Sequence, residues 1–219
     1  MRRSIVVPWL LVIALAAATA RADDAVDDAE IRERLAFLEA RIETQKLHAE
    51  IWWTSWLTFY SFGAVAQAVR ATQATDAASR ADLWISVVKA TGGAIRFIAI
   101  PHGGILGLEP SPRYTFGRSP AWRLARAERI AAHNAARTTP CAPWYAHVAN
   151  LAVNASGAVI VGAGYGDWQQ GIISAAIGFA VGEASFFTGP WEAPGDWAEY
   201  QARWRLDLGL GQAGVRLDF

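Results

Sequence analysis

The stretch Gly171–Phe187, GIISAAIGFAVGEASFF, is apolar and small-sided apart from the carboxylate of Glu183. Small residues recur in it at every fourth position, at Ser174, Gly178 and Gly182. A run of small residues at this spacing lets two helices approach closely, both in membranes and in tight soluble bundles. The stretch therefore predicts a closely packed helix, and it raises the question of what surrounds its single acid.

This helix is the second arm of an apolar helical hairpin that we predict over residues 144–190. The first arm runs from Trp144 to Tyr165, the letters GYGDW form the turn, and a Gly-Pro pair closes the hairpin. A second apolar hairpin is predicted over residues 51–101. Its first 19 residues, 51–69, carry no charge and are just long enough to cross a bilayer. A polar stretch over residues 71–80 then turns the chain.

Polar side chains inside these apolar arms form the candidate site. A buried carboxylate needs a partner or takes up a proton, because burial of an isolated charge is costly. We expect a basic side chain of the first hairpin to pair with Glu183. One interpretation is an ion pair that fixes helix register, and the other is a polar pocket for a small ligand or ion. The candidate residues are Lys89, Arg96, His147, Asn150, Asn154 and Glu183.

Residues 23–50 predict an amphipathic, coiled-coil-like helix that continues without a breaker into the first hairpin. Its apolar residues recur at spacings of four and three, as in a coiled-coil seam. The helix either self-associates through residues 31–49 or lies on its own bundle. The seam consists of Ile31, Leu35, Leu38 and Ile42, continued by Gln45, Ala49 and Trp52.

Two further segments differ from the hairpins. Residues 102–143 form a Gly/Pro-rich basic linker, in which Ser119 and Pro120 are the N-cap and first residue of a helix. This basic helix has either a solvated face or a surface that binds headgroups. In the tail, residues 191–219, apolar and polar residues alternate from Trp204 onward, which predicts a short β-hairpin.

The first residues indicate the compartment. Arg2 and Arg3 precede an apolar run that ends in an Ala-x-Ala pattern, so residues 1–22 are predicted to be a removed signal peptide. The alternative, an uncleaved anchor, is disfavoured because the run is short for a span. Cys141 is the only cysteine, so no internal disulfide can hold the fold. We expect an exported bacterial envelope protein on the periplasmic side.

Composition favours membrane contact. Hydrophobic residues make up 53% of the 219 and charged residues only 18%, whereas an average soluble domain has about 25% charged. The 11 tryptophans fit the same environment, since this side chain is enriched at membrane interfaces. Without the three arginines of the signal, 17 basic residues stand against 20 acidic ones. A net charge of −3 gives no indication of a nucleic-acid partner, and we expect membrane lipid instead.

Four membrane spans are disfavoured on two grounds. Export would place the arginine-rich residues 102–143 outside, against the positive-inside rule, and polar or charged side chains fall within three of the four segments. A bundle embedded by one face, or packed against copies of itself at the membrane, conflicts with fewer residues.

The sequence contains no catalytic signature such as GxSxG, a P-loop, HExxH or CxxCH. The four histidines have no partner at i,i+4, so we predict no metal site, and no cofactor. The predicted fold is mainly α: a helical bundle of two apolar hairpins with a coiled-coil-like N-terminal helix and a short C-terminal β-hairpin. We expect a non-catalytic, membrane-associated scaffold or assembly subunit that self-associates. The alternative is a membrane protein that binds a small ligand or ion between the hairpins, and an enzyme is the least favoured class.

Overall fold

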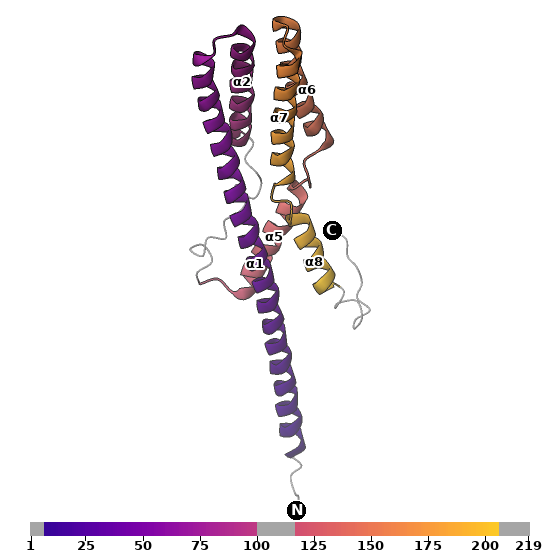
Figure 1. Cartoon of the computed structure of the whole chain (residues 1–219). Coiled ribbons are helices and arrows are strands. Elements are labelled where there is room, and N and C mark those ends of the chain that lie inside the picture. Colours follow the sequence, from indigo (N-terminus) through magenta and orange to yellow (C-terminus); the bar gives the residue numbers. More distant parts are fainter. Residues whose placement is uncertain (1–6, 100–116, 206–219) are drawn as a thin grey trace, which may run out of the picture.

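The computed structural model shows an elongated helical protein and describes residues 7–99 and 117–205, with side chains placed over residues 28–99 and 117–204 (Figure 1). One long helix runs through most of the molecule, and two hairpins lie side by side at one end of it. The described ranges contain no strand. Their helices are α1 (Val7–Gln73), α2 (Ala77–Ala99), α5 (Pro120–Arg137), α6 (Trp144–Tyr165), α7 (Trp168–Phe187) and α8 (Ala193–Arg205).

The first hairpin pairs the end of α1 with α2, and its turn is shorter than the predicted 71–80. Only residues 74–76 separate the two helices. Asp76 explains the early start of α2, because its carboxylate accepts a hydrogen bond of 2.7 Å from the backbone N–H of Ser79, as an N-cap side chain does. Helix α1 itself continues unbroken from the segment 23–50 into the hairpin.

The second hairpin has the predicted bounds within a residue. Helix α6 ends at Tyr165 and is capped by Gly166, whose φ of 78° is the left-handed conformation that glycine adopts without strain. Asp167 then caps α7, with its side chain accepting from the N–H of Gln170 at 2.9 Å. Helix α5 likewise begins as predicted, with Ser119 accepting from Trp122 N–H and Pro120 at the first helical position.

The predicted β-hairpin over residues 191–219 is wrong where the structure tests it. Helix α8 occupies Ala193–Arg205 and includes Trp204, which we expected to open a strand. Tyr200 and Trp204 are four residues apart, so they share one face of a helix, and both are buried against α1 and α5. Residues 206–219 lie outside the described residues. Over the described chain the fold is therefore all-α.

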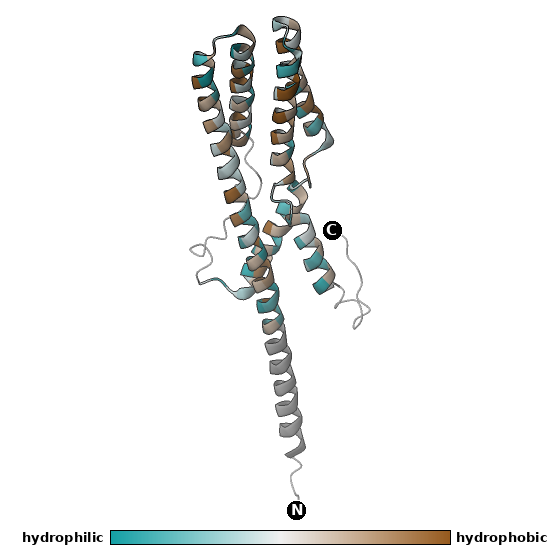
Figure 2. Cartoon of the chain, in the orientation of Figure 1, coloured by the Kyte–Doolittle hydropathy of each residue, from teal (hydrophilic) through white to brown (hydrophobic). Residues whose placement is uncertain are grey.

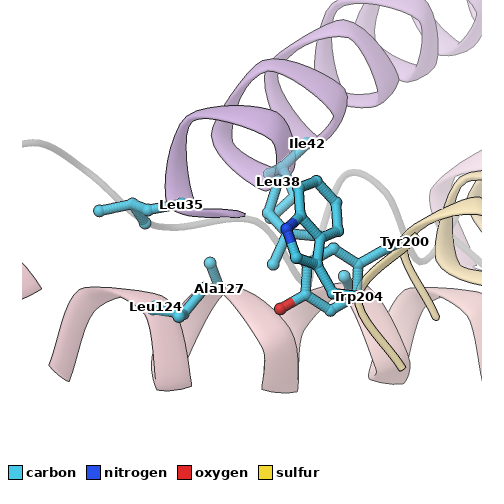
Figure 3. Packing of buried hydrophobic residues seen from close by; sticks show 8 residues of the cluster. Leu35, Leu38, Ile42, Leu124, Ala127, Tyr200 and Trp204 are labelled. Carbon is cyan, nitrogen blue, oxygen red and sulfur yellow. The ribbon is translucent and has the colours of Figure 1, made fainter. Parts of the chain in front are cut away.

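A small apolar core joins α1, α5 and α8 (Figure 3). Figure 3 shows Leu38 and Ile42 of α1 against the ring of Trp204, with Tyr200 beside it. The predicted coiled-coil seam is thus covered within the same chain. The buried members of this cluster are Leu35, Leu38, Ile42, Leu124, Ala127, Ala131, Tyr200 and Trp204.

The molecule divides into two halves of opposite polarity (Figure 2). We call residues 28–50, 117–143 and 189–205 the charged half, and residues 51–99 and 144–188 the apolar half. Of the ten ion pairs in the described residues, nine lie in the charged half, for example Arg34 with Glu128 at 2.7 Å. The charged half has its apolar side chains inside and its ion pairs outside.

In the apolar half the distribution of apolar and polar side chains is reversed. Large apolar side chains cover its outer surface, and polar side chains face its interior. Helices α6 and α7 are long and apolar enough to cross a membrane. In the apolar 18-residue stretch of each helix, only 22% is buried within the protein. The exposed side chains include Phe59, Phe62, Val65, Val88, Ile95, Ile98, Val148, Leu151, Val159, Ile172, Ile173 and Ile177.

Candidate functional site

Five of the six candidate residues form one hydrogen-bonded chain inside the apolar half. We call this chain the polar row. It starts in α6 and α7 at the end of the hairpin nearest the charged half and reaches the middle of α2. Its members, in order of contact, are His147, Glu183, Asn150, Asn154 and Lys89.

His147 and Glu183 form the outer end of the row. Nδ1 of His147 lies 2.6 Å from a carboxyl oxygen of Glu183, and Nε2 lies 2.9 Å from the carbonyl oxygen of Cys141. A carbonyl oxygen only accepts, so Nε2 carries a hydrogen. One further proton lies between Nδ1 and the carboxyl group, which makes the pair either imidazolium with carboxylate or imidazole with carboxylic acid.

Two asparagines connect this pair to Lys89. Asn150 donates from Nδ2 to Glu183 at 2.9 Å and to the carbonyl oxygen of Phe179 at 3.0 Å, and its Oδ1 accepts from Asn154 Nδ2 at 3.0 Å. Asn154 Oδ1 accepts from Lys89 Nζ at 3.3 Å. Each amide also donates from Nδ2 to a backbone carbonyl oxygen, Asn150 to that of Phe179 and Asn154 to that of Asn150, and a carbonyl oxygen only accepts, so both amide orientations are fixed. The amide dipoles therefore point their N–H ends toward the acid and their oxygens toward the lysine.

The predicted packing residues of α7 make room for this row. A Cβ at Gly178 would lie 2.0 Å from Asn154 Oδ1, and a Cβ at Gly182 would lie 2.3 Å from Asn150 Oδ1. The two glycines thus accommodate asparagine side chains rather than the backbone of a neighbouring helix. Ser174, the third predicted residue, is partly buried. The backbones of α6 and α7 come close together nearer the start of α7, at Gly171, where a Cβ would be 2.8 Å from the carbonyl oxygen of Ala158.

Arg96 does not join the row, and the expected pairing of Glu183 with a basic residue of the first hairpin is wrong. The partner of Glu183 is His147, from its own hairpin. The guanidinium of Arg96 lies instead over the rings of Phe186 and Phe97, at 4.7 and 5.3 Å from their centroids. Such cation–π contacts hold a cation against an apolar surface.

Sequence reasoning missed a second polar contact between the hairpins, at the end far from the charged half. Ser79 donates to Gln170 Oε1 at 3.2 Å, and Gln170 donates from Nε2 to Asp82 at 3.4 Å. Gln170 is 91 positions from Ser79 in the chain and 88 positions from Asp82. Only the pairing of the two hairpins brings them together.

Beside the polar row, residues of α2 and α6 line a shallow, open surface groove with a volume of about 460 Å³. Lys89 is one of its lining residues, and the other lining is largely apolar. A second groove of about 410 Å³ shares three of these residues and extends to Arg80 and Tyr165. The first groove is lined by Trp84, Ile85, Val88, Lys89, Val153, Ser156, Gly157 and Ile160.

The described residues contain no cluster of three or more His, Cys, Asp or Glu side chains that could hold a metal ion. The geometry thus offers one acid–base pair, two oriented amides and one lysine beside a groove. No protein-family model matches the chain, and no curated protein or solved structure is significantly similar to it.

Proposed function

We propose that the protein is a non-catalytic scaffold of the bacterial cell envelope whose apolar half crosses the membrane and holds the charged half at its surface. The observation that carries this proposal is the inversion of polarity between the halves. Exposed apolar patches on soluble monomers are rarely larger than a few hundred Å². Here apolar side chains cover all four helices of the hairpins, while nearly all ion pairs lie in the other half.

Helix length and aromatic residues support this placement. At a rise of 1.5 Å per residue, the 22 residues of α6 and the 20 of α7 extend about 33 and 30 Å, which matches a hydrocarbon core of about 30 Å. Trp144 and Tyr145 are exposed at one end of the hairpin, and Tyr165 and Trp168 at the other. Tryptophan and tyrosine gather at the two interfaces of membrane proteins in the same way.

Of the two grounds against four spans, the arginine-rich residues 102–143 on the outer side are addressed by the labelling of Cys141, whereas the polar and charged side chains no longer oppose a membrane location. Lys89, Glu183 and the asparagines point into the polar row, where they bind one another. Polar groups within membrane proteins are tolerated when they face the bundle interior and pair there. Arg96 is in the last turn of α2, close to the boundary with the charged half.

A scaffold also needs a rigid link between membrane and surface, and α1 supplies it by running through both halves. Trp53 and Trp56, near the boundary, donate indole hydrogen bonds to Phe97 O at 2.9 Å and to Thr188 Oγ1 at 3.0 Å. Self-association is part of this proposal. Because the seam of residues 31–49 is covered by α5 and α8, contacts between copies would use the outer faces of the hairpins.

The second candidate function is binding of a small ligand or ion within the membrane. The observation that favours it is the polar row itself, because replacing buried ion pairs by well-packed apolar residues is often neutral or stabilising, so a bundle that served only as an anchor has no need of the row. The groove at Lys89 provides a place for such a ligand.

Cysteine accessibility tests the membrane placement, because Cys141 is the chain's only cysteine and is exposed in the charged half. We expect a membrane-impermeant maleimide to label Cys141 in intact spheroplasts. In a Cys141→Ser background, Thr75→Cys in the far turn should react only after permeabilisation. Ile177→Cys, on the outer face of α7, should not react in either condition. Labelling of Ile177→Cys as fast as Cys141 would contradict the proposal.

Fractionation provides the matching control. The full chain should stay in the membrane pellet after carbonate extraction and enter solution only with detergent. A mass measurement on the detergent complex then reports self-association. Release by carbonate, or a monomeric mass across detergent and protein concentrations, would contradict the membrane-crossing scaffold and its self-association respectively.

A further inference from the structure

We propose that the groove between α2 and α6 binds one long-chain carboxylic acid, with its carboxylate on Nζ of Lys89. This inference rests on the proposed placement of the hairpins in the membrane, where such acids dissolve. It gives the ligand-binding function a substrate class and a site.

The first observation is that, among the described residues, no carboxylate is in contact with the amine of Lys89. Nζ of Lys89 has a hydrogen bond to one protein group, the neutral amide oxygen of Asn154 at 3.3 Å, and no carboxylate of the described chain lies within ion-pair distance. The charge of Glu183 is matched by His147, and Asp82 accepts from Gln170. Asp82 acts on this amine electrostatically but without contact, so within the described part of the chain Lys89 has no ion-pair partner and is either an unpaired cation or a neutral base. A carboxylic acid fits both states, supplying the anion in the first and a proton in the second, so the ion pair needs no other reactant.

The second observation is the size and the largely apolar lining of the groove. Its volume of about 460 Å³ is within the usual range for small-molecule sites, roughly 300–1,000 Å³. Apart from Lys89, its lining side chains carry two polar groups, the indole N–H of Trp84 and the Ser156 hydroxyl, which donates to the carbonyl oxygen of Ala152. Gly157 lets the side chains of α2 pack closely on α6, because a Cβ there would lie 3.1 Å from Ile85 and 3.7 Å from Lys89 Nζ. An apolar wall with one basic group favours an apolar ligand with one acidic head.

The shape of the groove indicates a single chain. The two adjoining grooves share Trp84, Ile85 and Ile160, and together they extend along α2 from Lys89 to Ala77. Twelve residues of helix correspond to about 18 Å, similar to the length of an extended palmitoyl chain. Each end of the groove has one cation and one carboxylate that acts on it, Lys89 with Asp82 and Arg80 with Asp76. Arg80 in addition donates to the carbonyl oxygen of Ala74 at 2.7 Å, whereas Lys89 has a hydrogen bond within the described chain only to the side chain of Asn154. The acidic head is therefore assigned to Lys89, and the chain follows the apolar lining along α2.

The test uses palmitate labelled with ¹³C at its carboxyl carbon and the purified full chain in detergent micelles. We expect saturable binding of one equivalent, reported by a shifted carboxyl NMR signal. Lys89→Met should weaken binding by about 30-fold or more, the lower end of the effect of truncating one partner of a buried charge pair. Lys46→Met is the matched control, because Lys46 is the only other lysine and lies in the charged half. It should bind palmitate as the wild type does.

Two further measurements keep the result decisive. Val88→Trp, at an exposed position of the groove wall, should block binding while Lys89 and the fold are retained. Hexadecanol, which has the same chain without the acid, should compete weakly. Equal binding by Lys89→Met, or equal competition by hexadecanol, would overturn the proposal. Displacement of palmitate by phosphatidylglycerol that depends on Arg80 and not on Lys89 would identify a phospholipid as the occupant instead.

Failure of this inference can be distinguished from failure of the membrane proposal. Carbonate extraction and maleimide labelling report membrane placement without any ligand. A chain that passes both tests but binds no palmitate is a membrane protein without this site. A chain released by carbonate that still binds palmitate through Lys89 keeps the site and loses the membrane span.

Discussion

Trp52 of α1 donates its indole N–H to the carbonyl oxygen of Ser185 in α7, over 3.1 Å. The bond ties the long helix to the second hairpin at the level where the two halves meet. Carbonyls in the last turn of a helix have no partner within that helix, so a side-chain donor satisfies a group that burial would otherwise leave unpaired. Both residues are buried, Trp52 at 7% exposure.

Replacing Trp52 by Phe should lower the free energy of unfolding by about 1–2 kcal/mol, because the ring stays apolar but the Ser185 carbonyl loses its donor. Denaturant unfolding of the detergent-solubilised protein, followed by near-UV circular dichroism, measures the change. Trp144→Phe is the control, since Trp144 is 75% exposed and its replacement should cost less than about 0.5 kcal/mol. Equal effects of the two substitutions would show that the indole bond contributes nothing.

Gly178→Ala and Gly164→Ala should have opposite effects on stability. A Cβ at Gly178 would lie 2.0 Å from Asn154 Oδ1, and overpacking of this kind costs about 1–3 kcal/mol. At Gly164 no atom lies within 4 Å of the added Cβ, so alanine should stabilise α6 by about 0.5–1 kcal/mol through helix propensity. Thermal unfolding of the two variants in one detergent gives the comparison.

The double variant Gly178→Ala with Asn154→Ala separates this clash from a general effect on α7. Removal of the Asn154 side chain gives the new methyl group space, so Gly178→Ala should then cost far less than it does alone. A cost that is the same in both backgrounds would mean that the asparagine is not what the glycine accommodates.

The boundaries of the helices could be predicted from the sequence more accurately than the contacts between them. The bounds of the second hairpin could be read from Gly166 and Asp167, because a left-handed C-cap and an N-cap have local signatures. Helix α8 was missed because the alternation that starts at Trp204 outweighed a helical spacing. Trp197, Tyr200 and Trp204 recur at three and four, and that spacing is the signal that the structure bears out.

In the candidate site, too, the residues that share one helix face could be predicted, whereas their partners on other helices could not. The stripe of His147, Asn150 and Asn154 on one helix face is a local pattern, and the structure brings all three to one side of α7. The partner of Glu183 depends on how α2 is rotated against α7, which no local pattern specifies. Arg96 was expected at Glu183 and lies on Phe186 instead. The groove between α2 and α6 is equally non-local, since its two walls belong to different hairpins.

Two double-mutant cycles that share Glu183 should give different coupling energies. His147→Gln with Glu183→Gln should show coupling of about 1–3 kcal/mol, as expected for two members of one hydrogen-bonded network. Arg96→Gln with Glu183→Gln should show less than about 0.5 kcal/mol, because Arg96 lies on aromatic rings and no ion pair in the described residues joins it to the acid. Unfolding of the single and double variants measures both. Strong coupling of Arg96 with Glu183 would restore the pairing predicted from the sequence.

Tyr200 should make the charged half sensitive to alkaline pH. Its hydroxyl donates to Glu128 and accepts from Arg34 Nε at 2.9 Å, and burial together with the bond to Glu128 raises the pKa of Tyr200 from 10.0 to about 12. The fold thus favours the protonated phenol, so its contribution to stability is complete below pH 10 and is lost as the pH rises to about 12. The difference in unfolding free energy between wild type and Tyr200→Phe should therefore shrink over this interval, as denaturant unfolding at each pH would measure. A difference that stays constant would mean that Tyr200 titrates alike in the folded and unfolded chains.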